Sequence, residues 1–369
     1  MAHDAVSHPG RYFATAASGL MSAEVLGSTM AHLRLEAELG APAAAARSMD
    51  AVARGYAAAG ELLGADADEI ALVESGNRGL QALIQSVDLK PGDHVLVDRT
   101  CWGGTLAMLA SLSGVVVDVM PVDDAGVVDV AAARRSADPR TRLVVLTWIP
   151  ATCGVVNPAE DVGALSAELG ACYFVDACQV VGQRPVDVAS LRCDGLVSSG
   201  RKWLGGPRGT AVLYASRRFL DATRPFMPDQ FGAGRTDARR YETGEANLAG
   251  RVGLAAALLS YQAAESERSA RMAAIADDIR RRAAAATRAY VVERGARLAD
   301  FVTLAGFDVA KAASDLARAG VTVSVPTREY APLDMDSRRL AEVMRIAPHP
   351  GTTLEDVEVL FDALSHWID

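Results

Sequence analysis

Lys202 lies in a segment rich in glycine and small residues, SSGRKWLGGPRG at positions 198–209. Apolar runs precede and follow this segment, which predicts a tight connection inside a core domain. Two interpretations of the lysine remain open at this point. It is either an ordinary surface lysine in a glycine turn or a partly desolvated amine that bonds covalently to a carbonyl carbon.

Asp176 ends a short apolar run, CYFVD at positions 172–176, and Gln179 follows three residues later. A carboxylate at the C-terminal end of a buried strand is well placed to pair with a protonated ring nitrogen, such as that of a pyridinium. The alternative is that Asp176 only caps the helix that follows the strand.

A third segment, ESGNRG at positions 74–79, joins a predicted strand to a predicted helix. Backbone N–H groups at the N-terminus of a helix bind phosphate well. Alone, this loop is weak evidence. Together, the three segments predict one cofactor site. In order along the chain, they supply a phosphate loop, an aspartate at a strand end and a lysine flanked by glycines.

These segments need a scaffold, which the sequence places between about residues 55 and 215 as alternating strands and helices. Runs such as LVVLT and CYFVD are apolar nearly throughout, as expected for strands buried on both faces of a mostly parallel sheet. The alternation implies right-handed crossovers and a doubly wound α/β core. From about residue 250, a long Ala/Arg-rich helix, expected over 251–288 with one break, leads into a smaller α/β unit. We therefore predict an N-terminal arm (1–20), a large cofactor-binding domain (21–250), and a helical hinge with a small C-terminal domain (251–369).

The strings ESGNRG, FVDACQ, SSGRKWLGGPRG, ETGEAN and MRIAPH resemble the class V aminotransferase branch of the fold-type I pyridoxal-phosphate enzymes, over essentially the whole chain. The resemblance implies that Lys202 carries pyridoxal 5′-phosphate, that Asp176 holds its pyridinium nitrogen, and that Gln179 contacts its phenolic oxygen. It also implies a phosphate site formed by Ser75, Gly76, Asn77, Ser199 and Arg201.

The same resemblance assigns four further residues. Trp102 falls where the family stacks an aromatic ring over the cofactor. Arg345 falls where the family grips the substrate α-carboxylate, a task that suits a bidentate guanidinium, and Thr152 is expected to join it in binding substrate. Glu245 replaces a threonine that many class V enzymes extend to the neighbouring subunit's phosphate, so we expect it to bind cofactor in a homodimer with shared active sites.

The longer strings HLRLEAELGAP, SSGRKWLGGPRG and YETGEANLAGRVG resemble more narrowly the carbon–sulfur lyases of ergothioneine biosynthesis and actinobacterial relatives, including those that cleave cysteine S-conjugates in lincosamide antibiotic pathways. Residues 321–345 contain no cysteine, whereas cysteine desulfurases carry a nucleophilic cysteine in that loop. The ergothioneine-type lyases have a tyrosine where this chain has Trp102. An indole does not cycle a proton as a phenol does, which favours a different S-substituted cysteine as substrate.

The leading hypothesis is therefore a β-lyase. Lys202 would remove the α-proton, Asp176 would keep the cofactor ring protonated as an electron sink, and Trp102 would complete the catalytic set. Departure of the β-sulfur gives a thiol, pyruvate and ammonia. The same residues would also serve transamination, epimerisation or decarboxylation-coupled oxidative deamination. A non-catalytic binding protein of the same fold is the third interpretation.

The composition argues against several other classes. The chain has 37 Lys and Arg residues and 46 Asp and Glu residues, which gives a net charge of −9. Nucleic acid is therefore not an expected partner. No apolar run reaches the ~18 residues of a membrane span, and the N-terminus lacks the apolar core of a signal peptide. We expect a cytoplasmic protein without a membrane partner. The five cysteines form no Cys-x-x-Cys pair and the six histidines no His-x-x-x-His pair, which predicts reduced thiols and gives no support to a metal site.

Overall fold

A seven-stranded sheet in the order β2-β8-β7-β6-β5-β3-β4 forms the larger part of the structure, a computed structural model that describes residues 11–369. Only β8 runs antiparallel to its neighbours. This arrangement confirms the predicted mostly parallel α/β sheet. The strands are β2 (Ile70–Val73), β3 (His94–Val97), β4 (Val116–Val119), β5 (Thr141–Thr147), β6 (Cys172–Asp176), β7 (Gly195–Val197) and β8 (Ala211–Ala215).

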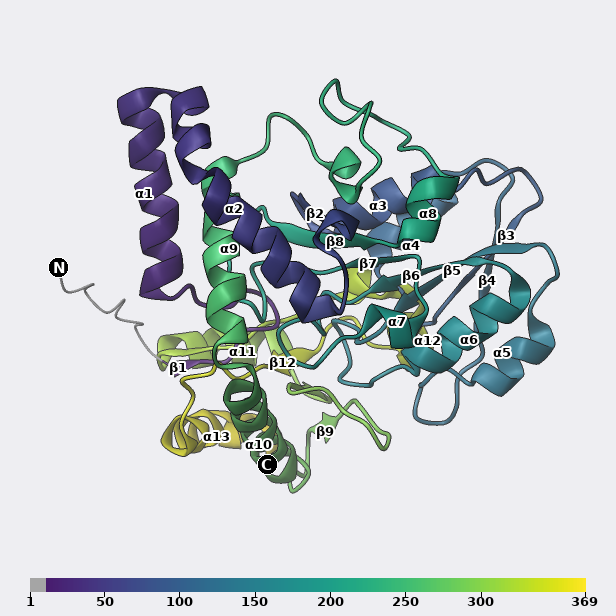
Figure 1. The fold of residues 1–369 in the computed structure, drawn as a ribbon. Helices are drawn as coiled ribbons and strands as arrows, with labels where there is room; N and C mark the ends of the chain where they lie inside the picture. The colour runs from purple at the N-terminus through teal and green to yellow at the C-terminus, as the bar shows by residue number, and fades with distance from the viewer. Residues whose placement is uncertain (1–10) are drawn as a thin grey trace.

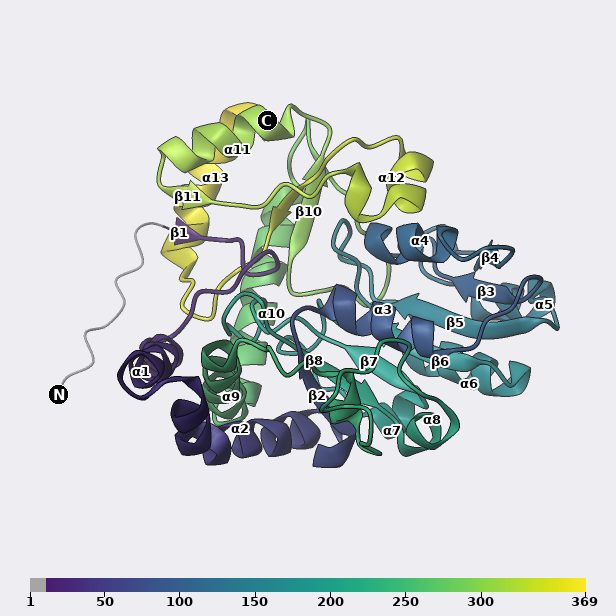
Figure 2. The same ribbon diagram turned by 90° about the horizontal axis from the view of Figure 1, so that it is seen from above.

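Both faces of this sheet are covered by helices, as the continuous apolar strands require. On β5, Leu143 and Val145 pack into the core shared with α3 (Gly76–Ser86) and α4 (Gly103–Ala110). The alternate residues Val144 and Leu146 pack into the core on the other face, where α6 lies (Figure 2). The other helices of this part of the structure are α5 (Val130–Ser136), α6 (Ala159–Leu169), α7 (Val188–Leu191) and α8 (Arg217–Ala222).

Three helices form a separate layer beside the sheet (Figure 1): α1 (Ala23–Leu39), α2 (Ala41–Leu63) and α9 (Leu248–Gln262). The sequence predicts a helix only over residues 55–63, which are the last turns of α2. Helix α1 buries just Val25 and His32, which explains why its apolar pattern is weak. The imidazole Nδ1 of His32 lies 2.7 Å from the Ser48 hydroxyl and joins α1 to α2.

The C-terminal part contains a three-stranded antiparallel sheet in the order β12-β10-β9. The long helix expected over 251–288 divides at Ala263–Ala264, so that α9 packs on α1 and α2 whereas α10 packs on this sheet. The domain boundary at residue 250 stays a prediction. Within residues 11–369, no helix is long and apolar enough to cross a membrane. The elements of this part are β9 (Tyr290–Val291), β10 (Val302–Ala305), β11 (Val321–Thr322), β12 (Met344–Ile346), α10 (Glu265–Ala283), α11 (Val309–Arg318), α12 (Pro332–Arg338) and α13 (Leu354–Ile368).

The segment before α1 contacts both parts of the chain, and its first strand forms a two-stranded sheet with β11. Strand β1 (Arg11–Tyr12) pairs in parallel with β11, and the chain then reaches the Lys202 segment, where the Gly19 N–H donates to the Arg201 carbonyl at 2.7 Å. A Cβ on Gly19 would lie only 2.1 Å from the Lys202 carbonyl oxygen, so this approach requires glycine. Residues 1–10 of the predicted N-terminal arm lie outside the described residues.

Candidate active site

A cavity of about 300 Å³ lies where the C-terminal ends of the parallel strands meet. The loops that follow β2, β3, β6 and β7 each contribute side chains, which is the usual position of a ligand site in a doubly wound sheet. The structure therefore brings together eight of the predicted residues at one cavity. Its lining is Glu74, Ser75, Gly76, Asn77, Trp102, Asp176, Cys178, Ser199, Arg201, Lys202, Arg208, Gly209 and Thr210.

Lys202 lies in the connection between β7 and β8 and lines this cavity. Burial lowers the pKa of its amine, an effect opposed by the charge of Asp176 and reinforced by the charges of Arg345 and Arg201. A lysine with a lowered pKa has a larger neutral fraction near neutral pH, which makes it a better nucleophile and base. The interpretation as an ordinary surface lysine does not fit this position.

Asp176 ends β6, as predicted, and lines the same cavity. Its Oδ1 accepts a hydrogen bond from the Cys178 N–H at 2.9 Å. This contact is a local turn, so the carboxylate also satisfies the backbone that follows the strand. Burial, followed by the Asp176 charge, raises the pKa of the Cys178 thiol to about 12. Cys178 is therefore a neutral thiol at physiological pH.

The N-terminus of α3 forms one end of the cavity. Ser75 caps this helix, with its hydroxyl accepting from the Arg78 N–H at 3.2 Å. A Cβ on Gly76 would lie 2.4 Å from Cys178 Sγ and 3.0 Å from the Ser198 carbonyl oxygen, so no larger residue fits here. The buried Oδ1 of Asn77 has no hydrogen-bond partner within residues 11–369. The backbone N–H groups at an open helix N-terminus form an anion-binding arrangement.

Trp102 directly precedes α4 and borders the cavity. Its ring makes an edge-to-face contact with the ring of Tyr330, with 5.0 Å between centroids and 83° between planes. Tyr330 belongs to η3 (Arg328–Tyr330), a short turn in the C-terminal part of the chain. The wall of the cavity at Trp102 is therefore supported by a residue more than two hundred positions away in sequence.

Arg345 lies in β12 and is almost completely buried. Its Nε donates to the Ser324 hydroxyl at 3.1 Å and its Nη1 to the Ala151 carbonyl at 2.8 Å. Burial lowers the pKa of this guanidinium to about 10. Thr152, beside Ala151, is also buried, and its hydroxyl has no partner in the described part of the chain. Neither Arg345 nor Thr152 lines the cavity itself, although the charge of Arg345 acts on Lys202.

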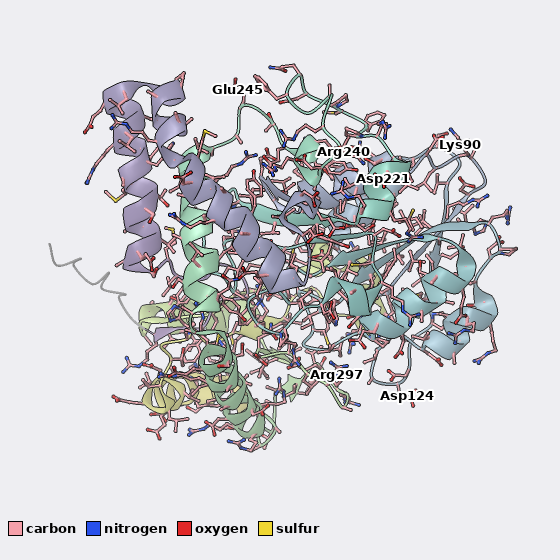
Figure 3. The ribbon with its side chains drawn as sticks, viewed as in Figure 1. Lys90, Asp124, Asp221, Arg240, Glu245 and Arg297 are labelled. Atoms are coloured by element: carbon pink, nitrogen blue, oxygen red, sulfur yellow. The ribbon has the colours of Figure 1, made fainter. Side chains whose placement is uncertain are left out.

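The structure does not bring two predicted cofactor-binding residues to the cavity. Gln179 is buried beneath it, where Nε2 donates to the Ala16 carbonyl at 2.9 Å and Oε1 accepts from the Trp203 indole at 2.8 Å. Both ends of this amide are thus occupied by protein groups. Glu245 is exposed at the outer edge of the loop before α9 (Figure 3) and does not line the cavity.

Asp98, at the end of β3, is completely buried behind the site. Its Oδ1 accepts from the Thr147 N–H at 2.6 Å, and its Oδ2 accepts from the Thr100 hydroxyl. Burial raises the pKa of this carboxyl to about 7, and the charge of Asp176 acts in the same direction. A second carboxyl group, with a raised pKa, therefore lies near Asp176.

The sequence model of the family described as "Aminotransferase class-V" matches residues 11–360. The chain belongs to this aminotransferase class-V family. It is 30% identical over 365 residues to a probable hercynylcysteine sulfoxide lyase of Mycobacterium tuberculosis, covering 96% of this chain and 89% of that protein. It is 33% identical over 210 residues to a cysteine desulfurase of Pectobacterium atrosepticum, but this match spans about half of either protein, 53% and 51%.

Solved structures agree with the class-V fold. The cysteine desulfurase CsdA of Escherichia coli superposes with a TM-score of 0.86 at 22% identity, covering 97% of this chain and 94% of that one. A cystine C–S lyase, solved with its product cysteine persulfide, superposes with a TM-score of 0.84 at 21% identity over 98% of both chains. These likenesses confirm the predicted fold type, and class-V membership agrees with the pyridoxal-phosphate cofactor and enzyme class predicted from sequence.

The class-V motifs did not reveal every cavity residue. Cys178 lies within the string FVDACQ and Arg208 within the string SSGRKWLGGPRG. Both residues belong to motifs used in the sequence analysis, but neither was given a role in the site. Tyr330 had no sequence signal, because nothing in a local motif shows that it meets Trp102. Among residues 11–369, no group of histidine, cysteine and acidic side chains is arranged to hold a metal ion.

Proposed function

We propose that this protein is a pyridoxal-phosphate-dependent carbon–sulfur β-lyase that acts on an S-substituted cysteine. One observation carries the proposal: Lys202 and Asp176 line a single cavity that ends at the open N-terminus of α3. That cavity offers an amine, a carboxylate and a phosphate-binding helix end, the three groups a pyridoxal-phosphate site needs.

The residues present fit this cofactor. Ser75, Gly76 and Asn77, with Ser199 and Arg201, would hold the phosphate at the α3 end, where the close approach of Gly76 to Cys178 and Ser198 leaves the backbone N–H groups accessible to a ligand. Arg208 adds a second guanidinium there. Asp176 would pair with the ring nitrogen, and Trp102 would stack on the ring. When bound, the cofactor supplies an electron sink for the carbon from which a proton is removed.

Lys202 would act as the base that removes the α-proton. The burial of its amine, with the charges of Arg345 and Arg201, lowers its pKa and so favours the neutral, proton-accepting form. The carboxylate of Asp176 accepts from the Cys178 N–H and also lines the cavity, so it would pair with the ring nitrogen. The two residues therefore divide the roles of base and charge partner.

Arg345 would hold the substrate α-carboxylate. Its contacts to Ser324 and the Ala151 carbonyl fix the guanidinium in place and leave its remaining N–H groups for a ligand. Thr152 is the neighbouring hydroxyl with an unpaired oxygen. A fixed guanidinium binds a carboxylate with more geometric specificity than a lysine amine.

The finer assignment rests on what residues 321–345 lack. They contain no cysteine, so no persulfide-forming thiol is available in that loop, which favours a lyase over a desulfurase. The similarity to a hercynylcysteine sulfoxide lyase supports an S-substituted cysteine substrate in an ergothioneine-like or lincosamide-type pathway. We further propose that Glu245 contributes to the cofactor site of a neighbouring subunit in a homodimer, since it is exposed and lies outside its own cavity.

Product analysis tests this function. Purified protein loaded with cofactor should convert cysteine S-conjugates into pyruvate and free thiol in equal amounts. Formation of the 2-oxo acid of the intact substrate together with an amine form of the cofactor would indicate transamination. Recovery of the D-amino acid would indicate epimerisation, and release of carbon dioxide with an aldehyde would indicate oxidative deamination. Absence of any product would indicate a binding protein.

A further inference from the structure

A β-lyase must supply a proton to the departing sulfur, because an alkyl thiolate is a poor leaving group. The groups already assigned do not provide this proton. Lys202 is needed at the α-carbon. The Trp102 indole does not cycle a proton. Cys178 lies against Gly76 at the phosphate end, and burial raises its pKa to about 12. The proton must therefore come from another side chain or from water.

Tyr330 is the phenol positioned for this task. Its ring contacts the ring of Trp102 edge-to-face, with 5.0 Å between centroids, and Trp102 lines the cavity. The side chain is 38% exposed, so solvent can restore a proton to it. It is thus both next to the cavity wall and connected to water.

Tyr330 also lies near two arginines of the candidate active site. The phenol is close enough to Arg201 and to Arg345 for its charge to act on both guanidinium groups. These arginines belong to different elements: Arg201 follows β7 and lines the cavity, whereas Arg345 lies in β12. Tyr330 is therefore close to active-site groups from both the large sheet and the C-terminal part of the chain.

The backbone around Tyr330 holds the ring in place. Its own N–H donates to the Thr327 carbonyl at 3.0 Å, and the Arg328 N–H donates to the Ala341 carbonyl at 2.8 Å. A Cβ on Gly103 would lie 2.0 Å from the Glu329 carbonyl oxygen, so η3 and the start of α4 are in direct contact. This close approach fixes Tyr330 relative to Trp102.

We propose that Tyr330 is the catalytic acid that protonates the leaving sulfur, an inference that rests on the proposed β-lyase function. The Cβ–S bond breaks, its electron pair stays on sulfur, and the phenolic proton of Tyr330 moves to that sulfur to give the free thiol. The resulting phenolate takes a proton from water, which reaches this partly exposed side chain. The C-terminal part of the chain thus supplies the acid, while the large sheet supplies the base.

The test compares two substrates in the Tyr330→Phe holoenzyme, which keeps the aromatic contact with Trp102. S-Methyl-L-cysteine needs a proton on its leaving group, whereas β-chloro-L-alanine loses chloride and needs none. We expect pyruvate formation from S-methyl-L-cysteine to fall about 100-fold or more, the usual contribution of a general acid. Turnover of β-chloro-L-alanine should change less than about threefold, within the range of minor repositioning.

Two controls separate acid catalysis from structural effects. L-Norvaline has the shape of S-methyl-L-cysteine without a leaving group, and its affinity, read from the visible absorption of the bound cofactor, should be the same in wild type and Tyr330→Phe. Tyr290→Phe, at an exposed tyrosine of β9, should leave all three measurements unchanged.

Equal losses on both substrates, weakened norvaline binding, or no loss on S-methyl-L-cysteine would overturn the role of Tyr330 and leave the lyase function standing. A wild-type protein that releases pyruvate from neither substrate would overturn both the proposed function and the acid role that rests on it.

Discussion

Arg99, which follows β3 of the large sheet, donates a hydrogen bond from Nε to Oδ1 of Asp334 in α12 at 2.9 Å. The other oxygen of Asp334 accepts from Arg338 Nε at 2.8 Å, and the carboxylate is completely buried. Because α12 begins directly after the Tyr330 segment, this aspartate joins the C-terminal part of the chain to the edge of the active site.

Replacing this carboxylate should destabilise the protein. Asp334→Asn removes the negative charge between Arg99 and Arg338, and breaking a buried ion pair from one side typically costs about 3 kcal/mol. Urea unfolding should show a lower midpoint. Asp336→Asn is the matched control, because Asp336 pairs with Arg328 on the surface, where ion pairs contribute little. Equal effects of the two substitutions would contradict this account.

The phosphate end of the cavity should not accept a methyl group. In Gly76→Ala, the new Cβ would meet Cys178 Sγ at 2.4 Å and force the start of α3 to move. We expect cofactor affinity, measured by titration of the apoprotein, to fall at least about tenfold, equivalent to ~1.4 kcal/mol. Gly234→Ala is the control, since a Cβ there meets nothing within 4 Å. A Gly76→Ala protein with normal cofactor affinity would show that phosphate binds elsewhere.

Asp98 should make stability depend on pH. Burial raises its pKa to about 7 from an ordinary value of 3.8, so between about pH 4 and 7 the folded protein holds a proton that the unfolded chain has released. The contribution of Asp98 to stability therefore falls as pH rises through this window. Asp98→Asn should remove that component of the slope of unfolding free energy against pH. Asp124, an exposed residue labelled in Figure 3, gives the control: Asp124→Asn should leave the slope unchanged. Identical slopes for wild type and Asp98→Asn would refute the assignment.

The proposed homodimer has a surface suited to it. The segment between α8 and α9, which contains Glu245, also contains three exposed apolar side chains, Phe226, Met227 and Phe231, which are 65%, 73% and 67% exposed. Sedimentation at micromolar concentration should give twice the 38.7 kDa of one chain, and Phe226→Asp should weaken the dimer. Leu354→Asp, at an exposed leucine of α13, should not. A wild-type protein that is active and only monomeric would contradict the prediction.

The sequence predicted the parts of this structure that local chemistry determines. Strands β5 and β6 were evident because a run buried on both faces is apolar throughout, and Lys202 and Asp176 were evident from their motifs. Helix α1 was missed because it buries only Val25 and His32. The direction of Gln179 and the meeting of Trp102 with Tyr330 depend on tertiary packing, which no local string records.

The attachment of the cofactor to Lys202 tests the central claim most directly. The chain has only three lysines, at positions 90, 202 and 311. Borohydride reduction of the holoenzyme followed by peptide mass spectrometry therefore distinguishes three possible attachment sites. We predict a single pyridoxyl-phosphate adduct on the peptide that contains Lys202, and none on that peptide's counterpart in Lys202→Ala. An adduct on Lys90 or Lys311, or a reduced protein without any adduct, would contradict the account.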